Sequence, residues 1–284
     1  MGYKKIDRTI SFADVILKNS MDKNRCLEHL IHINDSIDWP NIESILMDHY
    51  VVGTSSEGAD AYYPLLLFKC LLLQKWFRID SDPELESQIN DRISFKKFIG
   101  ISFGNVSPDH STFSRFRSRL SKEAMDRINS EILRQFERQG LTINEGIAVD
   151  ARLVKSASHP ISNNQIKELK DRQNTPEGKL DKNGKPIKFS RDTESDWTIK
   201  NDKAHYGLKE HASIDVNHGF ILSTTITSAS VNDSIYLPYC TTYSRHTKQP
   251  IKKVYADKGY FGKPNRKFLS MNNIGELCTT PHFG

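Results

Sequence analysis

Residues Ile251 to Gly262 read IKKVYADKGYFG, and this stretch decides the fold of the second half of the chain. Its apolar run ends at one carboxylate, Asp257, and two glycines then break the pattern. Earlier in the chain, Gly146 to Ser156 (GIAVDARLVKS) repeats the arrangement, with Asp150 at the end of its own apolar run. Short apolar runs bounded by turn residues are typical of strands. We therefore expect two strands that each end in an aspartate.

These two aspartates are candidates for one metal site. Side chains alternate between the faces of a strand, so Ala148 and Asp150 would share one face. If the two strands are neighbours, Asp150 and Asp257 meet, and one would stay protonated unless a cation lies between them. Magnesium suits this role because it binds a few carboxylates and completes its shell with water and phosphate oxygens, as in phosphoryl-transfer sites. The alternative is that each aspartate only forms a turn at a strand end.

The composition is that of an ordinary globular protein, with 37% hydrophobic and 26% charged residues over 284 positions. This length predicts two domains. The most apolar run, Tyr63 to Phe77, contains two lysines and is shorter than the roughly 20 residues that cross a bilayer, so we expect a buried helix. The N-terminal sequence lacks an apolar signal core, and the four cysteines form no CxxC pair. We expect a cytoplasmic protein that does not contact a membrane.

Positive charge follows the two aspartate motifs. Residues 1–150 carry 19 Lys and Arg against 22 Asp and Glu, whereas residues 151–210 carry 13 against 9 and residues 240–284 carry 8 against 2. A basic surface around acidic catalytic residues suits a polyanionic substrate such as nucleic acid. For residues 151–210, a solvated basic loop explains the charge equally well.

The first 140 residues read as mostly helical, without a strand of convincing period. Within them, residues 82–120 fit two short helices, a turn and a third helix, which is a helix-turn-helix arrangement. The third helix has an apolar stripe for the core and carries three arginines, Arg115, Arg117 and Arg119. Arginines on such a helix can contact phosphates or guanine edges of DNA. The alternative is that they are only solvated.

From residue 146 the pattern changes to strands. We expect strands at about 146–154, 205–215, 219–227, 251–257 and 274–280, and helices at about 232–245 and 263–272. This order predicts a mixed five-stranded sheet with helices on its faces, in which the strands of Asp150 and Asp257 are neighbours. Residues 156–203 are polar and contain several prolines and glycines, so we expect a long loop or flap there, partly disordered.

Two residues of the second expected strand, Lys209 and His211, share one strand face. They are candidates for contact with DNA phosphates, and the alternative is an ordinary sheet surface. A metal site of histidines is not indicated, because the spacing of His205, His211 and His218 does not place three ligands on one face.

The expected element order is that of the ribonuclease-H-like fold, and several motifs carry a family resemblance. The helical part contains YYPLLLFKCLLLQKWF, SDPELESQINDRISFKKFIG and SPDHSTFSRFRSRL, at residues 62–77, 81–100 and 107–120. The second part contains GIAVDARLVKS, HYGLKEHASIDVNHGFI, TSASVNDS and VYADKGYFG. In these motifs the chain resembles the DDE transposases of bacterial insertion sequences, over about residues 25–280.

The resemblance implies a helical, DNA-binding N-terminal transposase domain at residues 1–140 and a ribonuclease-H-like DDE domain at residues 141–284. It implies an enzyme that binds the terminal repeats of a mobile element, cleaves double-stranded DNA and joins the ends to a target site. Asp150 and Asp257 match the family's first two acidic metal ligands, for Mg²⁺ or Mn²⁺. We expect a homodimer associated with the bacterial nucleoid.

The sequence departs from the family at its third carboxylate, a Glu that the family carries on a helix after the fifth strand. Only Glu276 follows Asp257, and it falls inside the fifth expected strand. We therefore expect this chain to be truncated and inactive by itself. The alternative function is that of a non-catalytic DNA-binding regulator, which would inhibit the full-length transposase.

Overall fold

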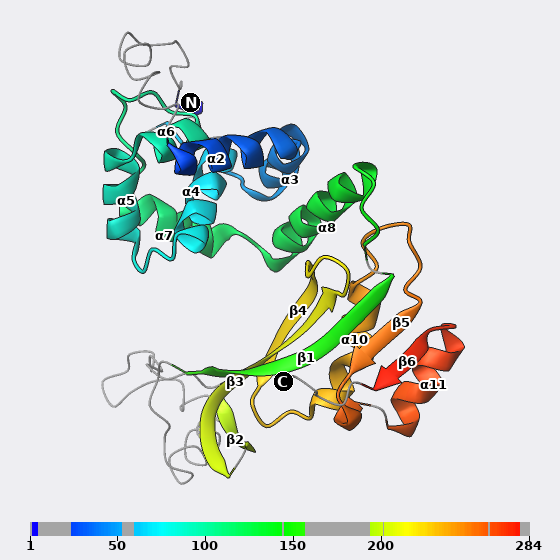
Figure 1. Ribbon diagram of the computed structural model, residues 1–284. Helices are drawn as coiled ribbons and strands as arrows, with labels where there is room; N and C mark the ends of the chain where they lie inside the picture. The colour runs from blue at the N-terminus through cyan, green and yellow to red at the C-terminus, as the bar shows by residue number, and fades with distance from the viewer. Residues whose placement is uncertain are drawn as a thin grey trace, which may run out of the picture. The chain divides into compact units, whose positions relative to one another are not determined.

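The computed structural model describes residues 2–4, 24–52, 60–143, 145–156, 194–200, 202–260 and 262–278. The chain divides into two compact units, Met1–Leu141 and Thr142–Gly284 (Figure 1). Within the described ranges, no helix combines the length and the apolar character that crossing a membrane requires.

The first unit is built from helices. They are α2 (Arg25–Ser36), α3 (Trp39–His49), α4 (Pro64–Trp76), α5 (Asp82–Asp91), α6 (Ile93–Ile99), α7 (His110–Arg119) and α8 (Lys122–Arg138). Four of them begin at a side chain that caps the first turn by accepting a backbone N–H: Asn24 before α2, Ser81 before α5, Asp109 before α7 and Ser121 before α8. The predicted helical character of this part of the chain is confirmed.

The core of the first unit forms around α4, whose sequence PLLLFKCLLLQKW is apolar on nearly all sides. Its Leu67, Cys70 and Leu73 are almost completely buried, and they belong to one cluster with Phe95 of α6 and Phe113 of α7. A helix that is hydrophobic all round is stable only inside a core, which explains why the other helices pack around it. The prediction of a buried helix here is confirmed.

The second unit is a mixed sheet with helices. Its strands are β1 (Gly146–Lys155), β2 (Asp196–Lys200), β3 (Lys203–Asp215), β4 (Ile221–Ser228), β5 (Lys253–Ala256) and β6 (Gly275–Cys278). Its helical segments are the 3-10 turns η2 (Asp233–Tyr236) and η3 (Lys258–Tyr260), and the α-helices α10 (Leu237–Tyr243) and α11 (Lys263–Met271). The predicted ribonuclease-H-like arrangement, a helical region followed by a mixed sheet with helices, is confirmed.

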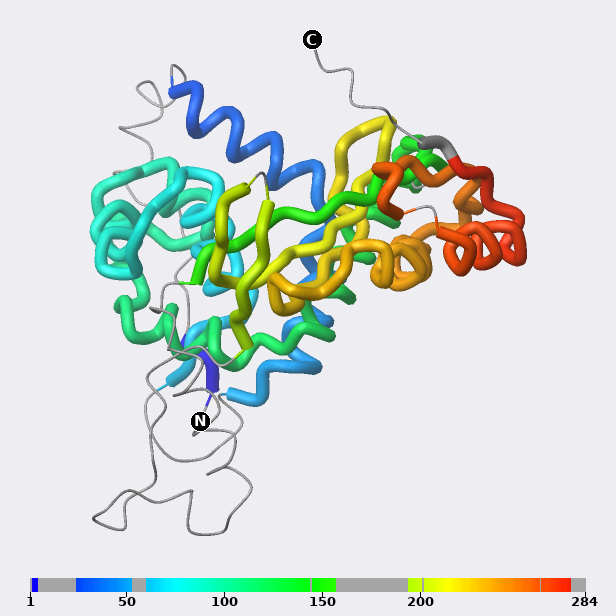
Figure 2. Tube along the Cα trace, turned by 90° about the horizontal axis from the view of Figure 1, so that it is seen from below, coloured from blue at the N-terminus to red at the C-terminus, as the bar shows by residue number. Residues whose placement is uncertain are grey.

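The long strand β3 and the strand β1 form the middle of this sheet. β3 pairs antiparallel with β1, and also with β4 and β2 along different parts of its length. β5 pairs with β1 and β6 pairs with β5, both in parallel. Parallel neighbours need a crossover, and α10 and α11 provide the crossovers to β5 and β6. Figure 2 follows the trace from α10 to β6, orange to red, at one end of this unit.

One face of the sheet is covered by α10, which contacts β1, β3 and β4. Ile147, Val149 and Ala151 of β1 are buried on that face. The opposite face is open over the described residues, since Ile214 of β3 and Ile226 of β4 are 39% and 62% exposed. The sheet therefore has a packed side and a solvent side in the described part of the chain.

The expectation of five strands is wrong, because the described sheet has six. The additional strand, β2, lies inside residues 156–203, which we expected to form a loop. It pairs with the first part of β3, from Lys200 opposite Lys203 to Asp196 opposite Gly207. None of its side chains is buried, so backbone pairing rather than an apolar face holds it in place. The larger part of that expected loop, residues 157–193, lies outside the described residues.

Candidate active site

Asp150 and Asp257 occupy matching positions on two neighbouring parallel strands. The β1–β5 register pairs Ile147 with Val254 and ends by pairing Val149 with Ala256. Asp150 and Asp257 are the next residue on each strand, and Asp257 is the first residue beyond β5. The structure therefore brings the two predicted aspartates together.

Both carboxylates lie on the solvent side of the sheet. The side chains of Val149 and Ala256 are buried on the covered face of the sheet. Because side chains alternate along a strand, the residue that follows each of them points to the solvent side. Asp150 and Asp257 are both exposed, as a site that receives a large substrate requires. Asp150 Oδ1 accepts a hydrogen bond of 2.7 Å from the N–H of Ala151, which limits the rotation of the carboxylate.

A turn and a clamp hold the chain after Asp257. The N–H of Tyr260 donates to the carbonyl oxygen of Asp257 at 3.0 Å and closes the 3-10 turn η3. The Nδ2 of Asn265 then donates to Tyr260 O at 2.6 Å and to Ser234 O at 2.7 Å. One buried amide thus joins the turn after Asp257 to the turn η2. Sequence reasoning missed Tyr260 and Asn265, since no pattern in a single sequence shows that two distant turns meet.

Two exposed carboxylates side by side suit a divalent cation, because Mg²⁺ and Mn²⁺ prefer carboxylate oxygens and the two charges need compensation. The donor set of Asp150 and Asp257 therefore fits the ion that the resemblance implies. Among the described residues, no group of three His, Cys, Asp or Glu side chains could hold a metal ion.

The expected contact of His211 with DNA is wrong, because His211 has no exposed surface. It lies on the covered face of β3, where its ring stacks on that of Tyr236 with 4.5 Å between centroids. Lys209 points to the same side, and only 12% of its side chain is exposed. Its Nζ contacts Asp233 Oδ1 at 2.7 Å and donates to Val231 O at 2.6 Å. Lys209 is thus engaged within the unit and not presented to DNA.

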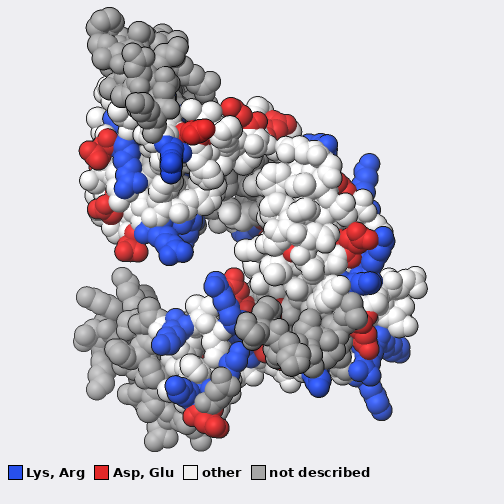
Figure 3. Space-filling model, in the orientation of Figure 1, with Lys and Arg blue, Asp and Glu red and all other residues white. Residues whose placement is uncertain are grey.

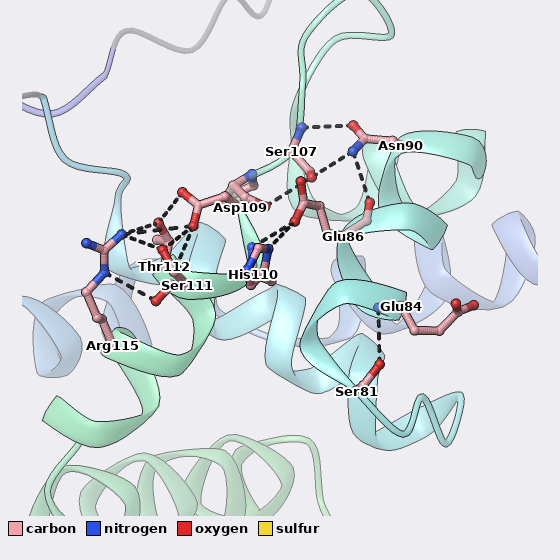
Figure 4. Close-up of polar contacts among 11 residues, drawn as sticks. Ser81, Glu84, Glu86, Asn90, Ser107, Asp109, His110, Ser111, Thr112 and Arg115 are labelled. Carbon is pink, nitrogen blue, oxygen red and sulfur yellow. Dashed lines mark hydrogen bonds and ion pairs between the residues drawn. The ribbon is translucent and has the colours of Figure 1, made fainter.

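In the first unit, α5, α6 and α7 place the predicted arginines on the exposed surface of α7. The N-terminus of α7 is joined to α5, where Glu86 accepts from the backbone N–H of His110 at 2.9 Å and contacts its Nδ1 at 3.0 Å (Figure 4). Asn90 of α5 bonds Ser107 in both directions, through Nδ2 to Oγ and through Oδ1 from the backbone N–H. These bonds fix the angle between the two helices.

The three arginines of α7 differ in how strongly they are held. Arg117 makes an ion pair with Asp82 of α5 at 2.7 Å, so it has a structural partner. Arg115 bonds its own helix through Ser111, as Figure 4 shows. Arg119 is exposed, and no described residue bonds it.

Charge on this surface is mixed. Figure 3 shows Lys and Arg side chains interspersed with Asp and Glu over the part of the first unit that contains α5 and α7. The cap residue Asp109 is one of the acidic groups: the hydrogen bond from Ser111 lowers its pKa, and bonds from Thr112 add to this effect. Any DNA contact must therefore come from particular arginines and not from a uniform basic face.

Two protein-family models match the chain. Residues 16–119 match the transposase domain DUF772, and residues 142–275 match the transposase DDE domain. The second match contains both Asp150 and Asp257. Together the two matches span most of the chain, in the order that the sequence motifs predict.

Solved structures with some likeness are also transposases. The Mos1 paired-end complex with the left transposon end has 10% identity and a TM-score of 0.26, covering 81% of this chain and 63% of that one. A Mos1 mariner paired-end complex with Mn has 11% identity and a TM-score of 0.25, covering 80% and 62%. The piggyBac synaptic complex with hairpin DNA has 13% identity and a TM-score of 0.36, covering 91% and 51%.

This chain thus spans between about half and two thirds of the length of those structures. Their low TM-scores leave the assignment to the family models. From the two matched domains, and from the paired aspartates inside the second, the chain belongs to the DDE transposases.

Proposed function

We propose that this protein acts in DNA transposition: it binds double-stranded DNA at the ends of a mobile element and supplies Asp150 and Asp257 to the site that cuts those ends and joins them to a target. The observation that carries the proposal is the parallel register of β1 and β5, which makes Asp150 and Asp257 neighbours at the C-terminal end of β5. Both carboxylates face solvent, where a DNA backbone can reach them.

In this proposal Asp150 and Asp257 hold a divalent cation, Mg²⁺ or Mn²⁺. When bound, such an ion stabilises the charge on the attacking and leaving oxygens of phosphoryl transfer. The protein's part is to hold both carboxylates in place: the Ala151 N–H orients Asp150, and the η3 turn fixes the backbone at Asp257. Lys258, exposed beside Asp257, adds a positive charge that favours the approach of phosphates.

DNA recognition is proposed for the first unit, through Arg115 and Arg119 of α7. Both are exposed, Arg115 can leave its bonds to Ser111 without uncovering a buried partner, and Arg119 has no bond to a described residue. Arg117 contributes less to DNA binding in this proposal, because its charge is already paired with that of Asp82. Since an element has two ends, we propose that two copies of the chain act together as a homodimer, in the nucleoid where the substrate lies.

The test is a cleavage and strand-transfer assay with the full chain, on DNA that carries both ends of the mobile element encoding it, with Mg²⁺ or Mn²⁺. Any cleavage by the unmodified chain should be abolished by Asp150→Asn and by Asp257→Asn. Asp196→Asn is the matched control, because Asp196 is also an exposed strand aspartate whose Oδ1 accepts from the next backbone N–H, at 2.7 Å. Cleavage that survives Asp257→Asn would refute the assignment of the site. Specific end binding without cleavage by the unmodified chain would favour a regulator.

A further inference from the structure

Three polar atoms beneath the Asp150–Asp257 pair are buried without a hydrogen-bond partner among the described residues. They are His211 Nδ1, Asp233 Oδ1 and Tyr260 Oη. His211 is fully buried and Tyr260 is 2% exposed, so bulk water does not reach them. Asp233 Oδ1 differs from the other two, because Lys209 Nζ lies 2.7 Å from it and the Asp233 side chain is 42% exposed. A buried polar atom without a bond costs about 1–3 kcal/mol, so His211 Nδ1 and Tyr260 Oη need an explanation.

The three residues meet at the turn η2. Asp233 begins this turn, and Tyr236, which ends it, stacks on the ring of His211. The clamp of Asn265 joins Ser234 O of the same turn to Tyr260 O. Burial is the larger influence on both, since it raises the pKa of Tyr260 and lowers that of His211, and the negative charge of Asp233 acts on both groups as the next cause.

The protonation of each atom follows from its surroundings. A tyrosine hydroxyl ordinarily loses its proton only at about pH 10, so Tyr260 Oη carries its hydrogen near neutral pH. Burial lowers the pKa of His211, so its imidazole is neutral near neutral pH. Tyr260 Oη is therefore a donor in need of an acceptor.

The tautomer of His211 is assigned from the contact of its other nitrogen. Thr227 Oγ1 donates to the carbonyl oxygen of Ser228 at 3.2 Å, so its proton is already used. The contact of 2.9 Å between His211 Nε2 and Thr227 Oγ1 is then satisfied by a hydrogen on Nε2, and we assign this tautomer to His211. With that tautomer, His211 Nδ1 carries a lone pair in need of a donor, and Asp233 Oδ1, which Lys209 Nζ contacts at 2.7 Å, has a second lone pair that can accept another bond.

One donor and two acceptors are what a single water molecule satisfies, since it accepts one bond and donates two. Buried waters typically make about three hydrogen bonds to polar groups that lack other partners. A cation is a poorer match, because Lys209 already balances the charge of Asp233 and the Tyr260 proton would point at it.

We propose that an internal water accepts from Tyr260 Oη, donates to Asp233 Oδ1 and His211 Nδ1, and makes Tyr260 and Asp233 positioning residues for Asp257. The positioning role rests on the proposed function, whereas the water does not. The backbone N–H of Tyr260 bonds the carbonyl oxygen of Asp257 and closes the η3 turn. A Tyr260 ring that cannot move therefore also holds Asp257 in position next to Asp150. Outer groups of this kind typically change metal affinity by about 10–100-fold when they are removed.

The water is tested by a high-resolution crystal structure of the full chain. We expect one ordered density peak within hydrogen-bond distance of His211 Nδ1, Asp233 Oδ1 and Tyr260 Oη. A dry space between these atoms, or direct hydrogen bonds among them, would overturn the proposal.

The positioning role is tested by Mn²⁺ titration of the full chain, followed by paramagnetic broadening of NMR signals around Asp150 and Asp257. Tyr260→Phe keeps the packed ring and loses the hydroxyl, and we expect it to weaken Mn²⁺ binding about tenfold. Tyr243→Phe, at a tyrosine that is 54% exposed, is the matched control and should bind as the unmodified chain does. Unchanged binding by Tyr260→Phe would refute the positioning role.

An Asp257→Ala arm separates this inference from the proposed function. If Mn²⁺ broadening persists in Asp257→Ala, the metal site itself is wrong. If it disappears there but Tyr260→Phe binds normally, only the positioning role fails. Should Tyr260→Phe not fold, the crystal structure of the unmodified chain still decides whether the water exists.

Discussion

Arg117 and Asp82 join α7 to α5 through two contacts, 2.7 Å between Arg117 Nη2 and Asp82 Oδ1 and 3.1 Å between Nη1 and Oδ2. Gln74 of α4 completes the arrangement: its Nε2 donates to Asp82 Oδ1 at 3.0 Å, and its Oε1 accepts from Arg117 Nη2 at 2.9 Å. Such forked pairs fix geometry as well as contributing energy. Three helices of the first unit are therefore tied at one point.

Replacing Arg117 with Met should lower the free energy of unfolding by about 1–2 kcal/mol, because Asp82 and the buried Gln74 both lose a partner. Urea unfolding of the full chain measures this. Arg127→Met is the matched control, since Arg127 pairs with Asp48 at 3.2 Å on an exposed surface and such pairs contribute under about 1 kcal/mol. Equal losses in the two variants would contradict the structural role of Arg117.

The same pair predicts a pH dependence. The hydrogen bond from Arg117 lowers the pKa of Asp82 in the folded state below its unfolded value of about 3.9. A lowered pKa stabilises the fold above the unfolded value, and this stabilisation is lost as pH falls through the folded value. The stability difference between the unmodified chain and Arg117→Met should therefore hold from pH 6 to about pH 4 and shrink below it. A difference that grows on acidification in urea titrations would contradict the assignment.

The pairing of Arg117 also sets an expectation for its neighbours. Replacing Arg115 and Arg119 together with Ala should weaken binding to element ends and reduce the salt dependence by roughly 0.9 in slope for each lost phosphate contact. Gel-shift titrations over a range of salt concentrations measure both quantities. Arg134→Ala, an arginine of α8 that contacts Glu131, is the control. If the double variant keeps the affinity and slope of the unmodified chain, α7 does not contact the DNA.

The sequence alone predicts the adjacency of Asp150 and Asp257, and the reason is physical. Each aspartate ends a short apolar run, and a parallel pair buried on one face has few alternative registers. The strand β2 is not predictable in the same way, because its side chains are not buried and Trp197 and Ile199 stand in a polar segment. Its stability comes from backbone pairing with β3, which leaves no period in the sequence.

The faces of β3 show a second limit. Alternation correctly places Lys209 and His211 on one face, but it does not say which face α10 covers. That depends on how the segment after β4 returns over the sheet, where Asp233 meets Lys209 and Tyr236 meets His211. We expected Lys209 and His211 to face DNA. Instead, their contacts with Asp233 and Tyr236 hold them on the covered face of the sheet.

The clamp of Asn265 gives a further prediction. Asn265→Ala should lower stability by about 1–3 kcal/mol, because Ser234 O and Tyr260 O lose their common donor at a buried position. It should also weaken Mn²⁺ binding at Asp257, measured by the same paramagnetic titration. Asn272→Ala is the matched control, as its Nδ2 also donates to a backbone carbonyl, that of Phe268 at 2.8 Å, but at an exposed helix end. If a folded Asn265→Ala protein binds Mn²⁺ with normal affinity, Asn265 does not help to position Asp257.

The strand that carries Asp150 depends on one close approach of two backbones. A Cβ built on Gly207 of β3 would lie 2.1 Å from Val154 O and 2.8 Å from Ser156 N of the β1 strand and its end. Backbone atoms on both sides of a strand pair cannot move aside without breaking the pairing, so Gly207→Ala should destabilise the second unit by more than about 3 kcal/mol.

Gly259→Ala is the control for this change, because a Cβ at Gly259 meets nothing within 4 Å although the residue follows Asp257 closely. Thermal unfolding should show a large loss for Gly207→Ala and little change for Gly259→Ala. Gly207→Ala should also lose Mn²⁺ binding, since Lys155 pairs with Gly207 on the strand that supports Asp150. If Gly207→Ala unfolds like the unmodified chain, the close contact of β1 and β3 at this position is wrong. The placement of Asp150 would then have to rest on its pairing with β5 alone.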